Sequence, residues 1–402
     1  MIYKNVIGLD ISDVAIKVVQ IDENKAAVTY GDFSLPAGIV TDGLITDHEL
    51  FVEKCTYILD HIKPVSVQGY FIKPHAIVSL PEDKVWSHTV RIPSEVSEKE
   101  YGQYITQEAA KVIPFELSEL YTSFTVSKIR DAQYGTFVGA QRAVVDQYLT
   151  CLDKVALKID FIGSNFFSVA RAVLPESFGS DNYIIIDVGH RRTTIGAFDE
   201  NAAPYVALQN FVSKHDIEHE KTSKSAGGTD SLGKEEAINS IVADISHVME
   251  DFLEHTGETI TKVLITGQLQ DTKDFVARIG ATLEVEVSIA NPYSRIRNTD
   301  IFVDVTSPVS FANTIGLALY GVDRTMPHIN LLPADEAAEN KGRLTLAPTF
   351  MTFDLKKTIQ GALAFLKKTY ASKHDQTALL GTVAFLVVTL VVLGYVLSLY
   401  LI

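Results

Sequence analysis

The chain has 402 residues, of which 35 are basic and 50 acidic, so its formal net charge is −15 at pH 7. Hydrophobic residues make up 47% and charged residues 21%, which is typical of a folded globular protein and excludes a disordered chain. The acidic balance argues against nucleic acid as a partner, and two cysteines, Cys55 and Cys151, are too few for a disulfide framework or a zinc site.

The N-terminal half is predicted to alternate between strands and helices. Apolar periodicity and turn residues predict, in order, strands over 6–10, 15–21 and 26–32, a helix over 50–61, strands over 76–80 and 85–92, a helix from Ser94 or Ser97 to residue 112, strands over 121–129 and 136–144, and a helix to residue 156. We therefore expect an α/β fold in which a strand-helix-strand-strand module, residues 76–158, is inserted into a first lobe formed by residues 1–75 and 159–182.

A similar order of strands begins again near residue 183. The patterns predict strands over 183–187 and 193–198, a polar surface loop over 214–234, a helix from Ile238 to about Gly257, a strand over 262–266, a helix over 271–279 that stops at Gly280, a strand over 283–289, and a helix over 308–320 that ends at Gly321. The repetition predicts a second lobe, residues 183–322, in which residues 211–280 form a small subdomain.

The C-terminal part has the pattern of a membrane anchor. Residues 341–376 contain seven lysines and arginines but only two aspartates, and residues 377–402 contain no charged residue. A helix over residues 377–402 would be about 39 Å long, enough for the roughly 30 Å hydrocarbon layer. We predict a linker over 334–353, a basic neck helix at the lipid surface over 354–376, and a single transmembrane helix. Because the basic residues precede the span, the positive-inside rule places the N-terminal head in the cytoplasm, at the cell (inner) membrane.

Two turns carry an aspartate at equivalent places in the two units. Asp10 ends the first predicted strand, and Asp187 ends the strand that begins near residue 183. Facing turns of this kind can bind a triphosphate, because backbone N–H groups bind anions and an aspartate can hold Mg²⁺ through water. A third turn, ending at Gly267, would face the nucleoside. The alternative is that each aspartate is ordinary turn chemistry.

Several blocks of the sequence together resemble PilM, the actin-like cytoplasmic protein of type IV pilus assembly, which is related in fold to FtsA. The blocks are Gly8–Lys17, Ile113–Glu116, Asp187–Ile195, Asn291–Tyr293 and Asn313–Leu319. The resemblance covers roughly residues 1–322. It implies an actin-like (FtsA/PilM type) two-lobed fold in which the inserted module, residues 76–158, is of the SHS2 type.

The resemblance also implies a site for ATP and Mg²⁺. Its candidate residues in this sequence are Asp10, Ser12, Lys17, Asp187, Gly189, Thr193, Thr194 and Gly267. The first turn departs from the family pattern, because Ser12 replaces a glycine and we expect the Asp13 carboxylate to face the phosphates. Gln268 follows Gly267 where a second glycine is expected, while His190, Arg191 and Arg192 add positive charge to the second turn. We therefore expect no enzymatic turnover.

A second resemblance begins after residue 322. Residues 328–333 are similar to the Ile-Asn-Leu-Leu-Pro peptide of PilN, which in that family docks into a groove on PilM and precedes a basic neck and a membrane span. The candidate partner-binding residues are Ile329, Asn330, Leu331, Leu332 and Pro333. The alternative is that these apolar residues only pack a last strand onto the head.

Together these features predict a membrane-anchored scaffold of the type IV pilus inner-membrane platform. The resemblance implies PilN/PilO-like and PilC-like proteins and the pilus motor ATPase as partners, together with membrane lipid; the chain itself could form a homo-oligomer. Two other functions are compatible with the fold: an FtsA-like membrane tether in cell division, and an actin-fold sugar kinase or ATPase.

Overall fold

The computed structural model describes residues 5–62, 74–155, 157–176, 180–189, 192–199, 204–212, 230–267, 272–303, 305, 307–323 and 329–332. All of these belong to one compact unit, residues 1–340. The predicted linker, neck helix and membrane span, residues 334–402, lie outside the described residues. Among the described residues, no helix is long and apolar enough to cross a membrane.

The first of two five-stranded sheets has the order β10-β6-β1-β2-β3. Its strands are β1 (Asn5–Ile11), β2 (Ala15–Asp22), β3 (Ala27–Ser34), β6 (His75–Leu80) and β10 (Lys158–Ser164). The first three form an antiparallel meander, and β6 and β10 run parallel to β1. The predicted meander is therefore confirmed, whereas β10 was not predicted.

The second sheet repeats this arrangement strand for strand, in the order β13-β12-β11-β14-β15. Its strands are β11 (Tyr183–Val188), β12 (Arg192–Phe198), β13 (Pro204–Val212), β14 (Lys262–Gly267) and β15 (Glu286–Ile289). Again the first three strands are antiparallel and the last two run parallel to the first. The duplication predicted from the sequence is confirmed, although β13 was not predicted.

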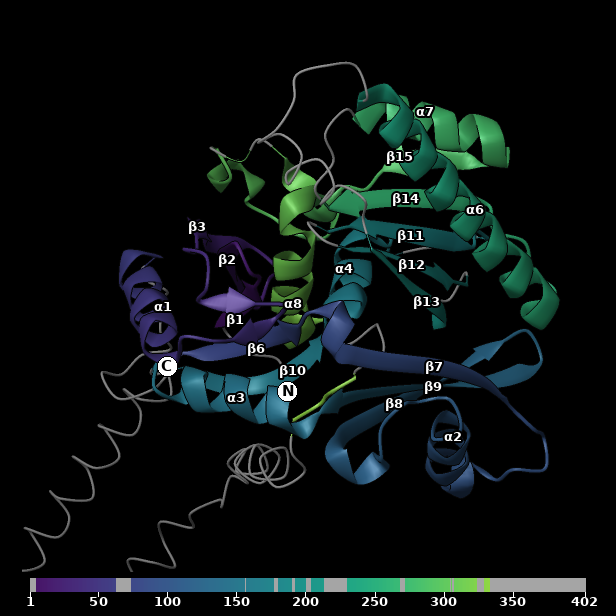
Figure 1. Cartoon of the computed structure of the whole chain (residues 1–402), viewed down its shortest axis with the longest axis horizontal. Coiled ribbons are helices and arrows are strands. Elements are labelled where there is room, and N and C mark those ends of the chain that lie inside the picture. The colour runs from purple at the N-terminus through teal and green to yellow at the C-terminus, as the bar shows by residue number, and fades with distance from the viewer. Residues whose placement is uncertain are drawn as a thin grey trace, which may run out of the picture. The chain divides into compact units, whose positions relative to one another are not determined.

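Two helices, α4 (Asn165–Val173) and α8 (Ala312–Val322), lie between the sheets (Figure 1). Every residue of α8 is buried, and the helix packs against β1, β2, β6 and α4. Glycines allow this close packing. A Cβ atom at Gly8 would lie 2.2 Å from the Thr314 carbonyl oxygen, and one at Gly316 would lie 1.7 Å from the Ser168 carbonyl oxygen.

A three-stranded sheet, β7-β9-β8, forms a separate module. Its elements follow the predicted order: β7 (Val85–Ile92), α2 (Tyr101–Ala109), β8 (Leu120–Ile129) and β9 (Ala132–Gln141), and a capping box of Ser97 and Glu100 precedes the helix. The observed module contains fewer elements than the predicted unit 76–158. Strand β6 pairs within the first sheet, and α3 (Arg142–Asp153) packs into the core of that sheet.

The tip of the β8–β9 hairpin contacts the second half of the head. Arg130 forms an ion pair with Glu258, and the Tyr134 hydroxyl donates a hydrogen bond to the His255 carbonyl oxygen at 2.7 Å. Ile129 and Tyr134 also belong to the apolar core that covers the second sheet. The module is therefore packed against both halves of the head.

Some predicted boundaries are wrong. Helix α6 (Asp230–Thr256) begins inside the predicted loop 214–234, whose residues 214–229 lie outside the described part of the chain. Helix α7 (Thr272–Leu283) continues through Gly280, and α8 follows a 3₁₀ turn and includes Gly321. A glycine costs only about 1 kcal/mol inside a helix, so tertiary packing can outweigh it. The remaining elements are α1 (His48–Ile62), β4 (Val40–Thr41) and β5 (Leu44–Ile45).

Replacing Gly316 tests the packing of α8. The Gly316→Ala methyl group would overlap the α4 backbone, which cannot rotate away as a side chain could, so we expect a loss of about 3 kcal/mol in the free energy of unfolding. Urea unfolding of the full chain in detergent measures this. Gly280→Ala is the matched control, since its Cβ meets no atom closer than 3.5 Å and should be neutral or slightly stabilising. Similar losses in both variants would contradict the packing argument.

Candidate functional site

A cleft of about 210 Å³ lies where the ends of β1 and β11 meet the first turns of α4 and α8. Asp10 and Asp187 occupy equivalent positions, each one residue before the end of its strand. Of the predicted nucleotide-site residues, Asp10, Ser12, Lys17, Asp187, Gly189, Thr194 and Gly267 all line this cleft. Thr193 does not, because successive residues of a strand point to opposite faces. The structure therefore brings together seven of the eight residues predicted for the nucleotide site.

The carboxyl groups of the cleft are poorly solvated. Burial raises the pKa of Asp187 to about 7, and the nearby Asp10 carboxylate adds to this shift while Lys17 opposes it. Burial also raises the pKa of Asp10, against the effects of Lys17 and a hydrogen bond from Asn313. Lys17 is the cross-strand neighbour of Asp10, and its ammonium group donates to the Ser310 carbonyl oxygen at 2.9 Å. The positive charge of Lys17 therefore lowers the pKa of both aspartates.

Glu82 is a cleft residue that the sequence reasoning missed. Its Oε2 accepts hydrogen bonds from the Ser164 hydroxyl at 2.7 Å and from the Phe166 backbone N–H at 3.1 Å, at the start of α4. Burial raises the pKa of Glu82 to about 7, although these two hydrogen bonds act in the opposite direction. The available signal was its position just after β6, which runs parallel to β1 and therefore ends at the same edge of the sheet.

The turn after β1 is closed by its own hydrogen bonds. The Ser12 backbone N–H donates to the Ala15 carbonyl oxygen at 2.9 Å, and the Ala15 N–H donates to the Ser12 hydroxyl at 3.1 Å. Asp13 lines the cleft, as expected, but its carboxylate is already bound by backbone groups of the chain. Its two oxygens accept hydrogen bonds from the backbone N–H groups of Asp42 and Gly43, both at 2.9 Å.

The described residues do not fit a triphosphate. The Ser12 and Ala15 N–H groups already form hydrogen bonds within the turn after β1. Lys17 is the single basic side chain among the described lining residues. Six carboxyl groups line the same space: Asp10, Asp13, Asp42, Glu82, Asp83 and Asp187. His190, Arg191 and Gln268 lie outside the described residues, as does the Arg192 side chain. Within the described ranges, no three His, Cys, Asp or Glu side chains come together to hold a metal ion.

Gly267 fixes the floor of the cleft. Its φ of +96° lies in the left-handed region, and a Cβ atom there would lie 2.2 Å from the Val188 carbonyl oxygen. Only glycine can therefore occupy this position while β11 and β14 stay in register. The backbone conformation alone therefore requires a glycine at the position that we predicted to face a nucleoside.

A second site is the groove occupied by residues 329–332. Ile329, Leu331 and Leu332 are 2%, 0% and 6% exposed and join the core around α3 and β10. The Leu331 N–H donates to the Ile162 carbonyl oxygen at 2.8 Å, and the Ile162 N–H donates to the Asn330 side-chain oxygen at 3.2 Å. The Asn330 N–H donates to the Ser123 hydroxyl on β8 at 3.2 Å. The segment thus contacts both the first sheet and the module, while Pro333 lies outside the described residues.

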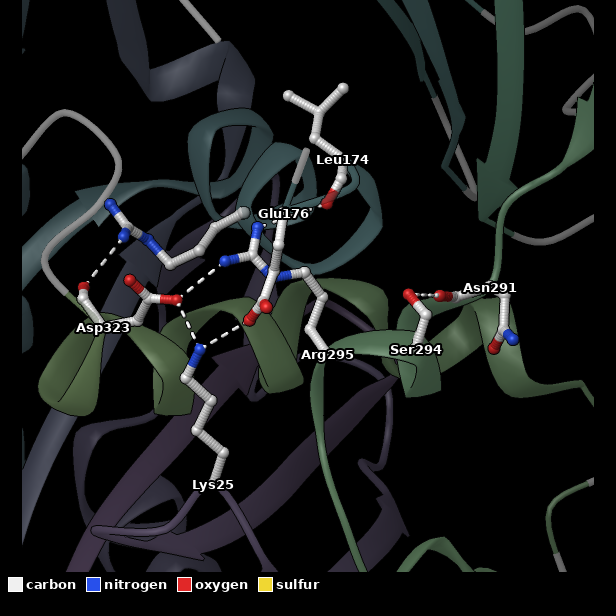
Figure 2. A network of polar contacts seen from close by, with 8 residues as sticks. Lys25, Leu174, Glu176, Asn291, Ser294, Arg295 and Asp323 are labelled. Atoms are coloured by element: carbon white, nitrogen blue, oxygen red, sulfur yellow. Dashed lines mark hydrogen bonds and ion pairs between the residues drawn. The ribbon is translucent and has the colours of Figure 1, made fainter. Parts of the chain in front are cut away.

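The chain leaves α8 through a partly buried ionic cluster (Figure 2). Asp323 accepts on Oδ2 from Arg295 at 2.7 Å and from Lys25 at 2.9 Å, and its carbonyl oxygen accepts from Arg171 at 3.1 Å. Lys25 also pairs with Glu176, which follows α4, at 2.8 Å. The cluster joins the β2–β3 turn to the ends of α4 and α8. It fixes the backbone six residues before Ile329.

The raised pKa of Asp187 predicts a stability that falls with pH. In the unfolded chain this pKa is near 3.8, so folding retains a proton between about pH 4 and 7, and the folded state loses stability as the pH rises through that range. Asp187→Asn should therefore be more stable than wild type at pH 8, by on the order of 3 kcal/mol, with a difference that shrinks towards pH 4. Urea unfolding at several pH values checks this. Asp60→Asn, exposed on α1, is the control; equal stability of Asp187→Asn and wild type at pH 8 would contradict the prediction.

Comparison with solved structures confirms a PilM-type α/β fold. A structure described as the "PilM-PilN type IV pilus biogenesis complex" matches with a TM-score of 0.64 at 17% identity, covering 79% of this chain and 98% of that chain. The cytoplasmic domain of EpsL from the type II secretion system of Vibrio cholerae gives a TM-score of 0.42 at 11% identity, covering 82% of this chain and 99% of that chain. The ethanolamine utilization protein EutJ from Carboxydothermus hydrogenoformans gives 0.42 at 12% identity, covering 79% and 92%.

None of the curated proteins compared with the chain gives a significant match. A family model, by contrast, spans residues 8–321, from β1 to α8, and is described as "Type IV pilus assembly protein PilM". This range includes both sheets, the module and the cleft. The chain therefore belongs to the PilM family of type IV pilus assembly proteins.

Proposed function

We propose that this protein is a membrane-anchored cytoplasmic scaffold of the type IV pilus inner-membrane platform, in which a PilM-like head is continuous with a PilN-like tail. The observation that carries the proposal is the groove filled by residues 329–332. Three apolar side chains of this segment are buried, and Asn330 pairs with the backbone of β10. Burying each leucine is worth about 1.5–3 kcal/mol, which supports a docking role for the segment.

The partners follow from the family. The matching solved structure is a complex of PilM with PilN, which supports a PilN-like partner for this head. We extend the proposal to PilO-like and PilC-like platform proteins, the pilus motor ATPase, and lipid at the basic neck, residues 354–376. The uncharged segment 377–402 would anchor the chain in the inner membrane with the head in the cytoplasm. A homo-oligomer is compatible with this arrangement.

The cleft supports a scaffold better than an enzyme. A kinase or ATPase needs backbone donors that bind the transferred phosphate. Here two N–H groups of the turn after β1 already form hydrogen bonds within that turn. The family resemblance implied a site for ATP and Mg²⁺, but the described cleft residues do not support it, and we propose that the scaffold role requires no turnover. An FtsA-like division tether is the second candidate, but it would not need the docked segment. Pull-down from detergent-solubilised membranes separates the two, since pilus proteins support the first role and division proteins the second.

Introducing charges into residues 329–332 tests whether this segment is docked on the head. Leu331→Asp with Leu332→Asp would place two carboxylates in an apolar groove, so the segment should undock and expose residues 320–340 to protease while the head stays folded. Limited proteolysis of the full chain in detergent measures this, and the number of pili in cells should fall. Leu253→Asp, on an exposed part of α6, is the control. Unchanged protease resistance at residues 320–340 would remove the basis of the proposal.

Deleting the uncharged segment tests the anchor. Removal of residues 377–402 should shift the protein from the membrane fraction to the soluble fraction. In intact cells carrying the full chain, protease added from outside should leave residues 1–376 uncut, and lysis should make them cleavable. Cleavage of the head before lysis would reverse the proposed orientation.

A further inference from the structure

Two groups of backbone donors in the cleft are occupied by carboxylates of the chain itself. The first group is the pair of consecutive N–H groups at Asp42 and Gly43, between β4 and β5. These residues have φ of +51° and +70°, and both N–H groups point to the Asp13 carboxylate, one to each oxygen. Consecutive N–H groups that converge on one point form the kind of nest that binds phosphate and other anions. Here the anion is supplied by residue 13.

The second group lies at the start of α4. The Phe166 N–H is one of the unpaired donors of the first helical turn, where the helix dipole also favours negative charge. It donates to Glu82, as does the Ser164 hydroxyl, which in turn caps the Phe167 N–H. Glu82 is buried at 8% exposure and comes from the end of β6. This position too is filled by a side chain from another part of the chain.

The two positions belong to one wall of the cleft. Gly43 is pressed against Pro81, since a Cβ atom on Gly43 would lie 2.7 Å from the Pro81 Cγ, and Glu82 is the next residue. The buried Tyr148 hydroxyl on α3 donates to the Gly43 carbonyl oxygen at 2.9 Å and holds the turn in place. Asp13, Asp42, Gly43, Pro81 and Glu82 all line the same cleft. The chain's carboxylates therefore tie the turn after β1 to the β4–β5 turn, and the end of β6 to α4.

We propose that Asp13 and Glu82 act as built-in carboxyl ligands that hold the cleft together and close these two donor groups to phosphate and polyphosphate. The N–H groups of Asp42, Gly43 and Phe166 already donate to these two side chains, so they are not open to phosphate oxygens. Removing either carboxylate should vacate its donors and create a site for an external anion. The inference goes beyond the scaffold role and does not depend on which assembly the head serves.

The test is a gain of binding. Asp13→Ala and Glu82→Ala are compared with wild type as full chains in detergent, with pyrophosphate alone and with Mg-ATP, by thermal unfolding and equilibrium dialysis. We expect no shift in the wild type, a lower Tm in each variant without ligand, and a rise in that Tm with pyrophosphate. A ligand at tenfold its Kd raises the folding equilibrium constant about elevenfold, which a thermal shift detects.

Two control variants separate vacated donors from reduced charge. Asp83→Ala removes one negative charge from the same cleft, but its carboxylate pairs with the Lys84 ammonium at 3.3 Å. Glu82→Gln removes the charge while keeping an oxygen that accepts from the Phe166 N–H. Neither should gain pyrophosphate binding. If Glu82→Ala does not fold, Asp13→Ala alone carries the test, because Asp13 lies on a partly exposed turn.

Three results would overturn the proposal. Stabilisation of the wild type by pyrophosphate or Mg-ATP would show that the donors are accessible. Equal gains in Asp83→Ala and Asp13→Ala would assign the effect to net charge. A folded Asp13→Ala variant without any pyrophosphate binding at millimolar concentration would show that the Asp42 and Gly43 N–H groups do not form an anion site.

Discussion

The close contact of helix α8 with β1 and α4 is the constraint on which both sites depend. Gly8 and Gly316 allow backbone to pack directly against backbone, and this close contact fixes the position of α8 between the two sheets. Its first residues, Ala312 and Asn313, then line the cleft, and its last turn ends at Asp323 in the ionic cluster. A single buried helix therefore positions the cleft at one end and the departure of the C-terminal segment at the other.

The cleft and the groove use polar groups in opposite ways. In the cleft, six carboxyl groups face one described lysine, and poor solvation raises the pKa values of Asp10, Glu82 and Asp187. In the groove, Asn330 is the polar residue among three apolar ones, and its side-chain oxygen accepts from the N–H groups of both Ile162 and Leu332. The first arrangement makes the cleft sensitive to protons. The second fixes the register of a short segment without using any charge.

Local patterns in the sequence were sufficient for most strands of the duplicated sheets, although β10 and β13 were missed. Buried runs such as Tyr183–Val188 and the turn residues between them identify hairpins without reference to the rest of the chain. Strand β10 was missed because its apolar pattern is broken by Asp160 and by a bulge between Ile159 and Phe161. Those features depend on the neighbouring strand β6, which a local pattern does not include.

The candidate site also contains residues that the sequence could predict and residues that it could not. Asp10 and Asp187 could be predicted because each stands at the end of a recognisable strand. The roles of Asp13 and Glu82 could not, since the partners of Asp13 lie 29 and 30 residues away and the Ser164 partner of Glu82 lies 82 residues away. Carboxylates near a predicted phosphate turn suggest repulsion of the ligand. That they bind backbone donors becomes apparent only when those donors are in place.

Strand β10 forms one end of the first sheet, and residues 329–332 are what pairs with its open side. Asn330 lies 168 residues after Ile162, its hydrogen-bond partner. At synthesis rates of roughly 5–20 residues per second, β10 leaves the ribosome about 8–35 s before the segment that covers it. During that interval the strand has unpaired N–H and C=O groups that another nascent chain could use for β-pairing. The position of the segment late in the sequence therefore sets how long this edge strand stays uncovered during synthesis.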